Sequence, residues 1–190
     1  MLFIGNIDEK HLVRRLRNGE NGAMEEFYSR YAPYLKGVCS RYISDKEDAK
    51  DVFQNALVRI ITHTTEFQYH GQGSLRAWAS RIVVHEALRF LNDMKRHELK
   101  TWDDDMMDVT EGDDPPIQDI PPEVIHQMVR QLPTGYRTVF NLYVFEDKSH
   151  KEIASLLGIS IGTSTSQLYR AKNLLADMIR EYKDKKQSPR

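Results

Sequence analysis

The sequence predicts an all-α protein made of two small helical domains joined by an acidic, extended linker. In both halves of the chain, capping residues stand ahead of stretches whose apolar residues repeat with a helical period. No stretch alternates apolar and polar residues well enough to indicate a strand. We therefore expect one helical domain over residues 1–100, the linker over 101–122 and a second helical domain over 123–190.

The distribution of charge supports this division. The chain of 190 residues has a formal net charge of -1, with 40% hydrophobic and 29% charged residues, which is ordinary for a globular protein. Residues 1–100 carry a net charge of +3, residues 101–122 a net charge of -8, and residues 123–190 a net charge of +4. Two mildly basic domains are therefore separated by a strongly acidic segment, which the whole-chain charge conceals.

The first two helices are expected near the N-terminus. Asn6 followed by Glu9 is typical of a helix start, and Gly19 marks the end of that helix. A second helix is expected over residues 23–43. We expect Pro33 to kink or divide it, because proline removes a backbone hydrogen bond inside a helix.

Two longer helices complete the first domain. Ser44 and Glu47 have the spacing of a capping box and open a helix that should reach about Thr64. After a polar and aromatic loop with two glycines, Ser74 can cap a long helix that extends to Lys95 or beyond.

The segment 101–122 is predicted to be a spacer. Its eight acidic residues repel one another and its four prolines disfavour regular structure. The run from Asp103 to Asp105 lacks the alternating oxygen ligands and final Glu of a calcium loop. We expect no metal site here and no cofactor anywhere in the chain.

Residues 149–171 read as a helix-turn-helix. Ser149 and Glu152 form a second capping box, Gly158 suits the left-handed residue that ends a helix, and Ser160 can cap the next one. Only a three-residue turn, 158–160, separates the two helices. So short a turn makes them cross sharply, which can present the second helix to a DNA major groove. The alternative is an ordinary helical hairpin in an all-α core. Helices are expected over residues 123–131, 134–145, 149–157 and 161–184.

The cellular compartment is expected to be the cytoplasm. Cys39 is the only cysteine, so no internal disulfide can form, and we expect it to be buried as a small hydrophobic residue. The first residues lack the basic start and longer apolar run of a signal peptide. No apolar run reaches the roughly 18 residues of a membrane-spanning helix.

Several segments together resemble a known family. Residues 131–140, Gln-Leu-Pro-Thr-Gly-Tyr-Arg-Thr-Val-Phe, and the helix-turn-helix that follows resemble region 4 of bacterial sigma-70-type factors. Residues 45–54, Asp-Lys-Glu-Asp-Ala-Lys-Asp-Val-Phe-Gln, resemble the region 2 helix that grips RNA polymerase. Residues 73–78 and 81–84 resemble the segment that melts and reads the promoter. The presence of regions 2 and 4 alone is the layout of the extracytoplasmic-function (ECF) subfamily.

The resemblance implies an RNA polymerase sigma factor that directs the core enzyme to specific promoters and helps to melt DNA in a stress or envelope-signal response. It implies core RNA polymerase, promoter DNA and an anti-sigma factor as partners, with no small-molecule substrate. The alternative is a stand-alone helix-turn-helix regulator. An enzyme is disfavoured, because no catalytic or metal-ligand spacing and no glycine-rich phosphate loop is found.

By the same resemblance, one helix face should bind the polymerase and the next two segments should open the promoter. The expected polymerase contacts share one acidic and amide-bearing stripe: Asp48, Asp51, Gln54 and Asn55, the last standing where Glu is frequent. The residues expected to receive a flipped base, hold phosphates or face the upstream element are Phe67, Tyr69, His70, Arg76, Arg81, His85, Arg89 and Asn92. Family members often have Asn or a small polar residue at the positions of His85 and Arg89. Trp78 is not counted among these residues, because we expect its ring to be buried in the core.

In the helix-turn-helix, Ile161 is expected to point inward and Arg170 to read a guanine. Gln167 would read an adenine and the lysines would hold phosphates. Thr165 and Gln167 are neutral where close relatives usually have Lys or Arg. The residues expected to contact DNA are Lys148, Lys151, Thr163, Thr165, Ser166, Gln167, Tyr169, Arg170 and Lys172.

Overall fold

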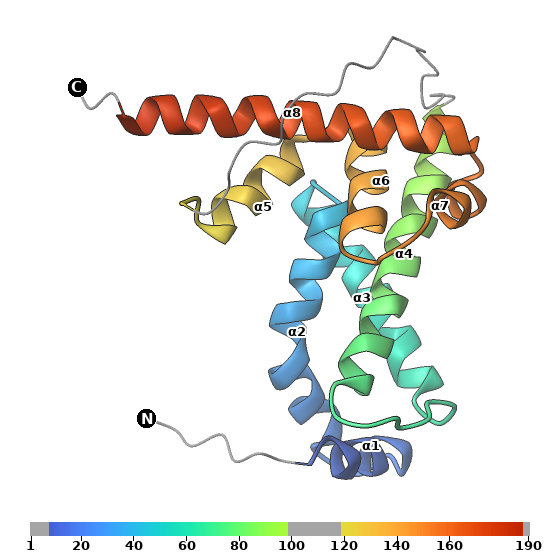
Figure 1. Cartoon of the computed structure of the whole chain (residues 1–190). Helices are drawn as coiled ribbons and strands as arrows, with labels where there is room; N and C mark the ends of the chain where they lie inside the picture. The colour runs from blue at the N-terminus through green and yellow to red at the C-terminus, as the bar shows by residue number, and fades with distance from the viewer. Residues whose placement is uncertain (1–7, 99–118, 188–190) are drawn as a thin grey trace. The chain divides into compact units, whose positions relative to one another are not determined.

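The computed structural model describes residues 8–98 and 119–187, which form eight α-helices and no strand within those two ranges. The chain divides into two compact units, Met1–Leu91 and Asn92–Arg190 (Figure 1). The all-α fold that the sequence predicts is confirmed.

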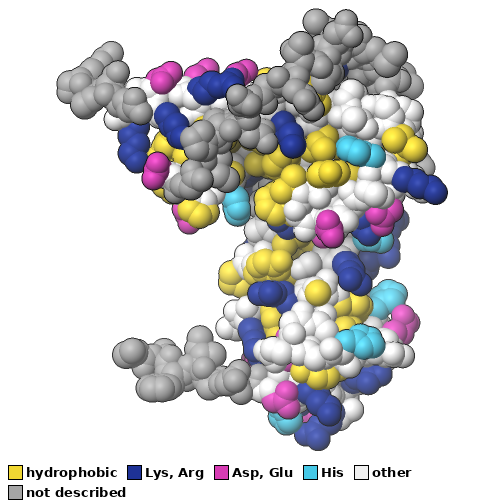
Figure 2. Space-filling model, in the orientation of Figure 1, with side chains coloured by type: hydrophobic (Ala, Val, Ile, Leu, Met, Phe, Trp, Pro, Cys, Tyr) yellow, Lys and Arg dark blue, Asp and Glu magenta, His cyan; other side chains and the backbone are white. Residues whose placement is uncertain are grey.

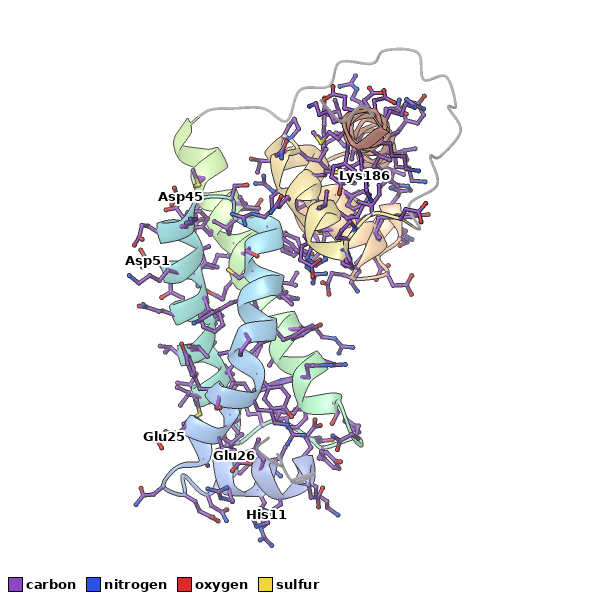
Figure 3. All side chains as sticks on the ribbon, turned by 90° about the vertical axis from the view of Figure 1, so that its left-hand side faces the viewer. His11, Glu25, Glu26, Asp45, Asp51 and Lys186 are labelled. Carbon is purple, nitrogen blue, oxygen red and sulfur yellow. The ribbon has the colours of Figure 1, made fainter. Side chains whose placement is uncertain are left out.

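The first unit is a helical bundle. It contains α1 (Glu9–Arg17), α2 (Ala23–Tyr42), α3 (Lys46–His63) and most of α4 (Ser74–Glu98). Figures 1 and 3 show α2, α3 and α4 side by side, with α1 across one end. Apolar side chains from all four helices form its core and are almost completely buried: Leu12, Phe27, Leu35, Tyr42, Ile60, Leu75 and Val83.

Two helix starts differ from the expectation. The cap of α1 is Asp8, whose carboxylate accepts from the amide of Lys10 at 3.0 Å, while Asn6 lies outside the described residues. The cap of α3 is Asp45 in place of Ser44, and it accepts from the amides two and three residues further on. An aspartate carries a full negative charge, which also interacts favourably with the positive end of a helix.

Helix α2 is one continuous helix of 20 residues that contains Pro33. The expected division at this proline does not occur. Phe27 and Leu35, on either side of the proline, are both fully buried. Packing on both sides therefore holds the segment in a single helix despite the hydrogen bond that proline removes.

A buried carboxylate joins α1 to the start of α4. Glu9 is only 1% exposed, and its carboxylate accepts from the hydroxyl of Tyr31 at 3.0 Å. It also accepts from the backbone amides of Gly73 at 3.1 Å and Leu75 at 3.0 Å. Ser74, the expected cap, is the first helical residue instead, and its hydroxyl donates to the Gly71 carbonyl. Amides at the α4 start are thus satisfied by a side chain from another helix.

The second unit contains α5 (Pro122–Gln131), α6 (Thr134–Val144), α7 (His150–Leu157) and α8 (Ile161–Gln187). Ile120 is buried in the core of this unit, and Pro122 is the first residue of α5. Both were expected in the linker, but the burial of Ile120 and the helical position of Pro122 make them part of the second unit. The rest of the expected linker, 101–118, lies outside the described residues. The core cluster is formed by Ile120, Met128, Val129, Leu132, Ala171, Leu175 and Ile179.

A buried arginine fixes the turn between α5 and α6. The Arg137 side chain donates to the carbonyls of Arg130 at 3.0 Å and Leu132 at 3.1 Å. Those carbonyls lie at the end of α5, where helical carbonyls lack a partner within the helix. Burial lowers the pKa of Arg137, and the nearby charge of Arg130 lowers it further.

The local signals of the helix-turn-helix are confirmed. Ser149 and Glu152 cap α7 reciprocally, with the Ser149 amide 2.9 Å from the Glu152 carboxylate. Gly158 ends α7 in the left-handed conformation, with φ 62° and ψ 42°. The Ser160 hydroxyl accepts from the amide of Thr163 at 2.9 Å at the start of α8.

Candidate polymerase and nucleic-acid interfaces

The outer face of α3 carries the four side chains that are expected to bind the polymerase. Asp51, Gln54 and Asn55 are exposed and Asp48 is half-buried, whereas the opposite face of α3 is buried. Figure 3 shows Asp51 pointing away from the neighbouring helices. Carboxylates and amides that share one exposed face can dock on a basic partner surface.

The same face continues into two apolar side chains that sequence reasoning missed. Val58 is 59% exposed and Ile61 is 49% exposed. They lie two turns beyond Asp51 and Gln54 on the same side of α3. Exposed apolar side chains beside polar ones are typical of protein interfaces. The signal in the sequence is an apolar pair at helical spacing on an otherwise polar face.

The loop before α4 differs in part from the expectation. Phe67 is only 5% exposed and packs against Trp78, with ring centroids 4.9 Å apart. Its ring therefore belongs to the core and cannot wall an open base pocket in this conformation. Tyr69 is half-buried and His70 is exposed, so both face the accessible side of the loop. Partial burial raises the pKa of Tyr69, as do the neighbouring carboxylates of the α1 start.

The basic residues of α4 lie on accessible surface. Arg76, Arg81, His85 and Arg89 are exposed and Asn92 is half-buried. All of them are therefore available to a nucleic acid without rearrangement of the core.

Three of these side chains have further neighbours. The Arg76 guanidinium lies 5.2 Å from the ring centre of Tyr34 on α2. Arg81 and His85 line a cavity of about 470 Å³ between α3 and α4, together with Trp78. The ion pair between Arg59 and Glu86, with Nε and Oε1 at 2.6 Å, holds the two helices together at this cavity.

In the second unit, the residues expected to contact DNA differ in how exposed their side chains are. The exposed side chains are Lys151, Thr165 and Lys172. The half-buried ones are Lys148, Ser166, Tyr169 and Arg170. The Lys148 ammonium pairs with Glu152 at 3.2 Å, and the Arg170 guanidinium donates to the Tyr136 hydroxyl at 3.3 Å. These pairs orient both cations before any DNA binds.

Three expectations for α8 are wrong. Gln167 is 2% exposed, so it cannot reach a base edge, and Thr163 is 7% exposed. Ile161 was expected to point inward but is 54% exposed. The inward face of the first two turns carries polar residues, among them the fully buried Ser164, whose hydroxyl lies 2.9 Å from His150 Nδ1 of α7. Polarity alone therefore misplaced these residues of the first two turns, whereas Leu168 and Leu175 further along α8 are buried.

A residue that sequence reasoning missed connects the two helices of the motif. The His150 ring nitrogen Nδ1 lies 2.9 Å from the Ser164 hydroxyl, and the ring stacks on Tyr143 at 4.9 Å. These contacts join the start of α7 to α8 and to α6. They fix the crossing of the helix-turn-helix in addition to its apolar core.

Among the described residues, no group of three or more His, Cys, Asp or Glu is placed to hold a metal ion. None of the helices in the described ranges combines the length and the apolar character needed to cross a bilayer.

Comparison with known proteins finds a family match in each half of the chain. The family described as sigma-70 region 2 matches residues 27–97, and the family described as sigma-70, region 4 matches residues 123–175. The RNA polymerase sigma-H factor of Pseudomonas aeruginosa is 24% identical over 178 residues, covering 88% of this chain and 91% of that protein. The sigma factor SigV of Bacillus subtilis is 26% identical over 135 residues, covering 70% of this chain and 77% of that protein.

A solved structure of the sigma factor RpoE from Bartonella quintana, in complex with the anti-sigma factor NepR, is 20% identical. It covers 84% of this chain and 98% of that chain, with a TM-score of 0.48.

A helical unit that matches sigma-70 region 2, followed by a helix-turn-helix unit that matches region 4, defines a transcription initiation factor rather than a DNA-binding domain alone. The chain belongs to the sigma-70 family of RNA polymerase sigma factors and has the two-region composition of its ECF type.

Proposed function

We propose that the two units divide the work of promoter recognition. The first unit, with the expected bounds 1–100, binds core RNA polymerase and opens the promoter, and the second reads double-stranded DNA upstream. The observation that carries this proposal is the exposed acidic face of α3 in the same chain as a fully capped helix-turn-helix. A stand-alone regulator has no use for the first of these features.

The polymerase-binding surface is the α3 face from Asp48 to Asn55, extended by Val58 and Ile61. Its carboxylates set the orientation and rate of docking, and its apolar end adds buried area. Charge reversal by Asp51→Arg should abolish retention on immobilised core polymerase. Glu25→Arg is the matched control, because Glu25 is exposed on α2 and Figure 3 shows it away from Asp51.

The promoter-opening surface consists of Tyr69 and His70 with the arginines of α4, without Phe67. The loop side chains would receive an unstacked base, and Arg76, Arg81 and Arg89 would hold phosphates, with His85 and Asn92 on the same surface. In the second unit, Arg170 and Thr165 would contact base edges, with Ser166 and Tyr169 beside them. Lys148, Lys151 and Lys172 would hold phosphates.

The decisive experiment is transcription in vitro with purified core polymerase and a promoter library. The chain should produce promoter-dependent transcripts that neither component yields alone. Specific DNA binding by the isolated chain, without any effect on polymerase, would support the stand-alone regulator instead.

The chain would act in the cytoplasm by binding, without catalysing a reaction of its own. Its Bartonella relative is described as bound to an anti-sigma factor. We propose that this chain is also held inactive by an anti-sigma factor in a stress or envelope-signal response. Such a partner should compete with core polymerase for the chain in a pull-down.

A further inference from the structure

The turn between α7 and α8 and the first turns of α8 carry no charged side chain. Residues 153–169 contain no Asp, Glu, Lys, Arg or His, although 29% of the whole chain is charged. Figure 2 shows mainly white and yellow surface, the colours of uncharged side chains and backbone, over the start of α8 at the upper right. In a helix-turn-helix, the first turns of the second helix are the part that contacts base edges. Recognition by these turns therefore depends on hydroxyl and apolar groups.

The hydroxyl groups of Thr165 and Ser166, which are expected to contact DNA, are already engaged within the protein. The Thr165 hydroxyl donates to the carbonyl of Ile161 at 3.0 Å. The Ser166 hydroxyl donates to the carbonyl of Thr163 at 3.1 Å. A hydroxyl has a single hydrogen to donate. In this conformation, neither side chain has a donor left for a base edge.

Two apolar groups remain on the outer side of these turns. Ile161, the first residue of α8, is 54% exposed, although isoleucine is among the residues most often buried. Thr165 is exposed four residues further on, so the two side chains are neighbours on one face of the helix. Because the Thr165 hydroxyl turns back to the Ile161 carbonyl, its γ-methyl group is the part that remains available to a partner.

Among the groups that base pairs present in the major groove, the C5-methyl group of thymine is the apolar one. We propose that Ile161 and Thr165 read neighbouring thymines through these methyl groups. Such a contact removes apolar area from water and needs no hydrogen bond from the protein. This inference rests on the proposed function, in which the second unit reads double-stranded DNA. It adds Ile161 as a specificity-determining residue and names the base that it recognises.

The test uses holoenzyme reconstituted with core polymerase and a promoter recovered from the library. Each thymine in the duplex DNA bound by the second unit is replaced in turn by deoxyuridine, which lacks only the methyl group. The affinity of the holoenzyme is then measured for every substituted promoter. Ile161→Ala removes the isoleucine contact, and Thr165→Ser removes a methyl group but keeps the hydroxyl. The matched control is Leu156→Ala, which shortens an exposed aliphatic side chain of α7.

Deoxyuridine should lower the affinity of the unaltered chain about fourfold at each of two thymines, the value of one buried methyl group. Ile161→Ala should bind the unsubstituted promoter about fourfold more weakly and should not respond to deoxyuridine at the first of these thymines. Thr165→Ser should lose the response at the second thymine only. Ile161→Val, which keeps a branched apolar side chain, and Leu156→Ala should keep both responses.

Two results would overturn the assignment of Ile161. One is a promoter in which no thymine responds to deoxyuridine with the unaltered chain. The other is Ile161→Ala losing affinity by the same factor on every template, which would assign Ile161 to a contact with the polymerase. A full methyl response in Thr165→Ser would overturn the role of the Thr165 methyl group. Failure of the proposed function looks different, because the unaltered chain would then add no promoter binding to core polymerase.

Discussion

The carboxylate of Glu9 accepts a hydrogen bond of 3.0 Å from the backbone amide of Leu75, 66 residues further along the chain. Through this bond α1 stabilises the start of α4, the helix that follows the loop proposed to open the promoter. Tyr31 holds the same carboxylate from a third helix, so one buried acid connects α1, α2 and α4.

Replacement of this acid should loosen the start of α4. Glu9→Ala leaves the amides of Gly73 and Leu75 and the hydroxyl of Tyr31 buried without their acceptor, which should cost roughly 3 kcal/mol of stability. Hydrogen–deuterium exchange at Leu75 should accelerate, and open-complex formation should weaken with it. Glu9→Gln, which keeps one acceptor oxygen, should lie between Glu9→Ala and the unaltered chain. Unchanged exchange in Glu9→Ala would show that the cap contributes nothing, and Glu25→Ala on exposed α2 surface is the matched control.

The Tyr31 hydroxyl should make the stability of the first unit depend on alkaline pH. Burial, the hydrogen bond to Glu9 and the negative charge of the Glu9 carboxylate raise the pKa of Tyr31 from 10.0 to about 12. Because the folded state favours the protonated phenol, this stabilisation is fully present below about pH 10 and is lost as the pH rises through about 12. The free energy of unfolding should therefore fall more steeply in this range than it does for Tyr31→Phe. Parallel curves for the two proteins would contradict the prediction.

The stability that the α7 capping box contributes should also depend on pH, but it should be lost on the acidic side. The Ser149 amide and hydroxyl, followed by the Lys148 ammonium, lower the pKa of Glu152 from 4.5 to about 2. The ionised carboxylate is favoured in the folded state, so its contribution is present above about pH 4.5 and is lost as the pH falls through about 2. Ser149→Ala should raise the pKa of Glu152 in an NMR titration and cost about 1 kcal/mol. Ser155→Ala, at an exposed serine of the same helix, should leave that pKa in place.

Gln167 and Arg170 should give opposite results on base preference. Gln167 is buried, and its Oε1 atom has no hydrogen-bond partner among the residues that the structure describes, so Gln167→Leu should retain the promoter preference of the unaltered chain. Arg170→Ala should cost roughly 1–3 kcal/mol of DNA binding and relax specificity at one base pair. Selection from a randomised promoter library measures both. A changed preference in Gln167→Leu would mean that the first turns of α8 rotate on DNA.

Features encoded within a few residues could be predicted from the sequence alone. The reciprocal cap of Ser149 and Glu152, the left-handed Gly158 and the Ser160 cap are all as expected, because each interaction joins residues close together in the chain. The acidic stripe on α3 could be predicted for the same reason, since helical periodicity sets which residues share a face. Helix positions, the helix-turn-helix and the family therefore follow from local sequence.

Only the tertiary structure decided which polar groups are buried and what they contact. Glu9 and Gln167 are polar, and their polarity alone suggests exposed positions, but neighbouring helices cover both. Phe67 has an aromatic ring that could stack on a base, yet that ring packs on Trp78. The reason is that the burial of a side chain depends on which face another helix covers, and that helix can come from a segment far away in the sequence.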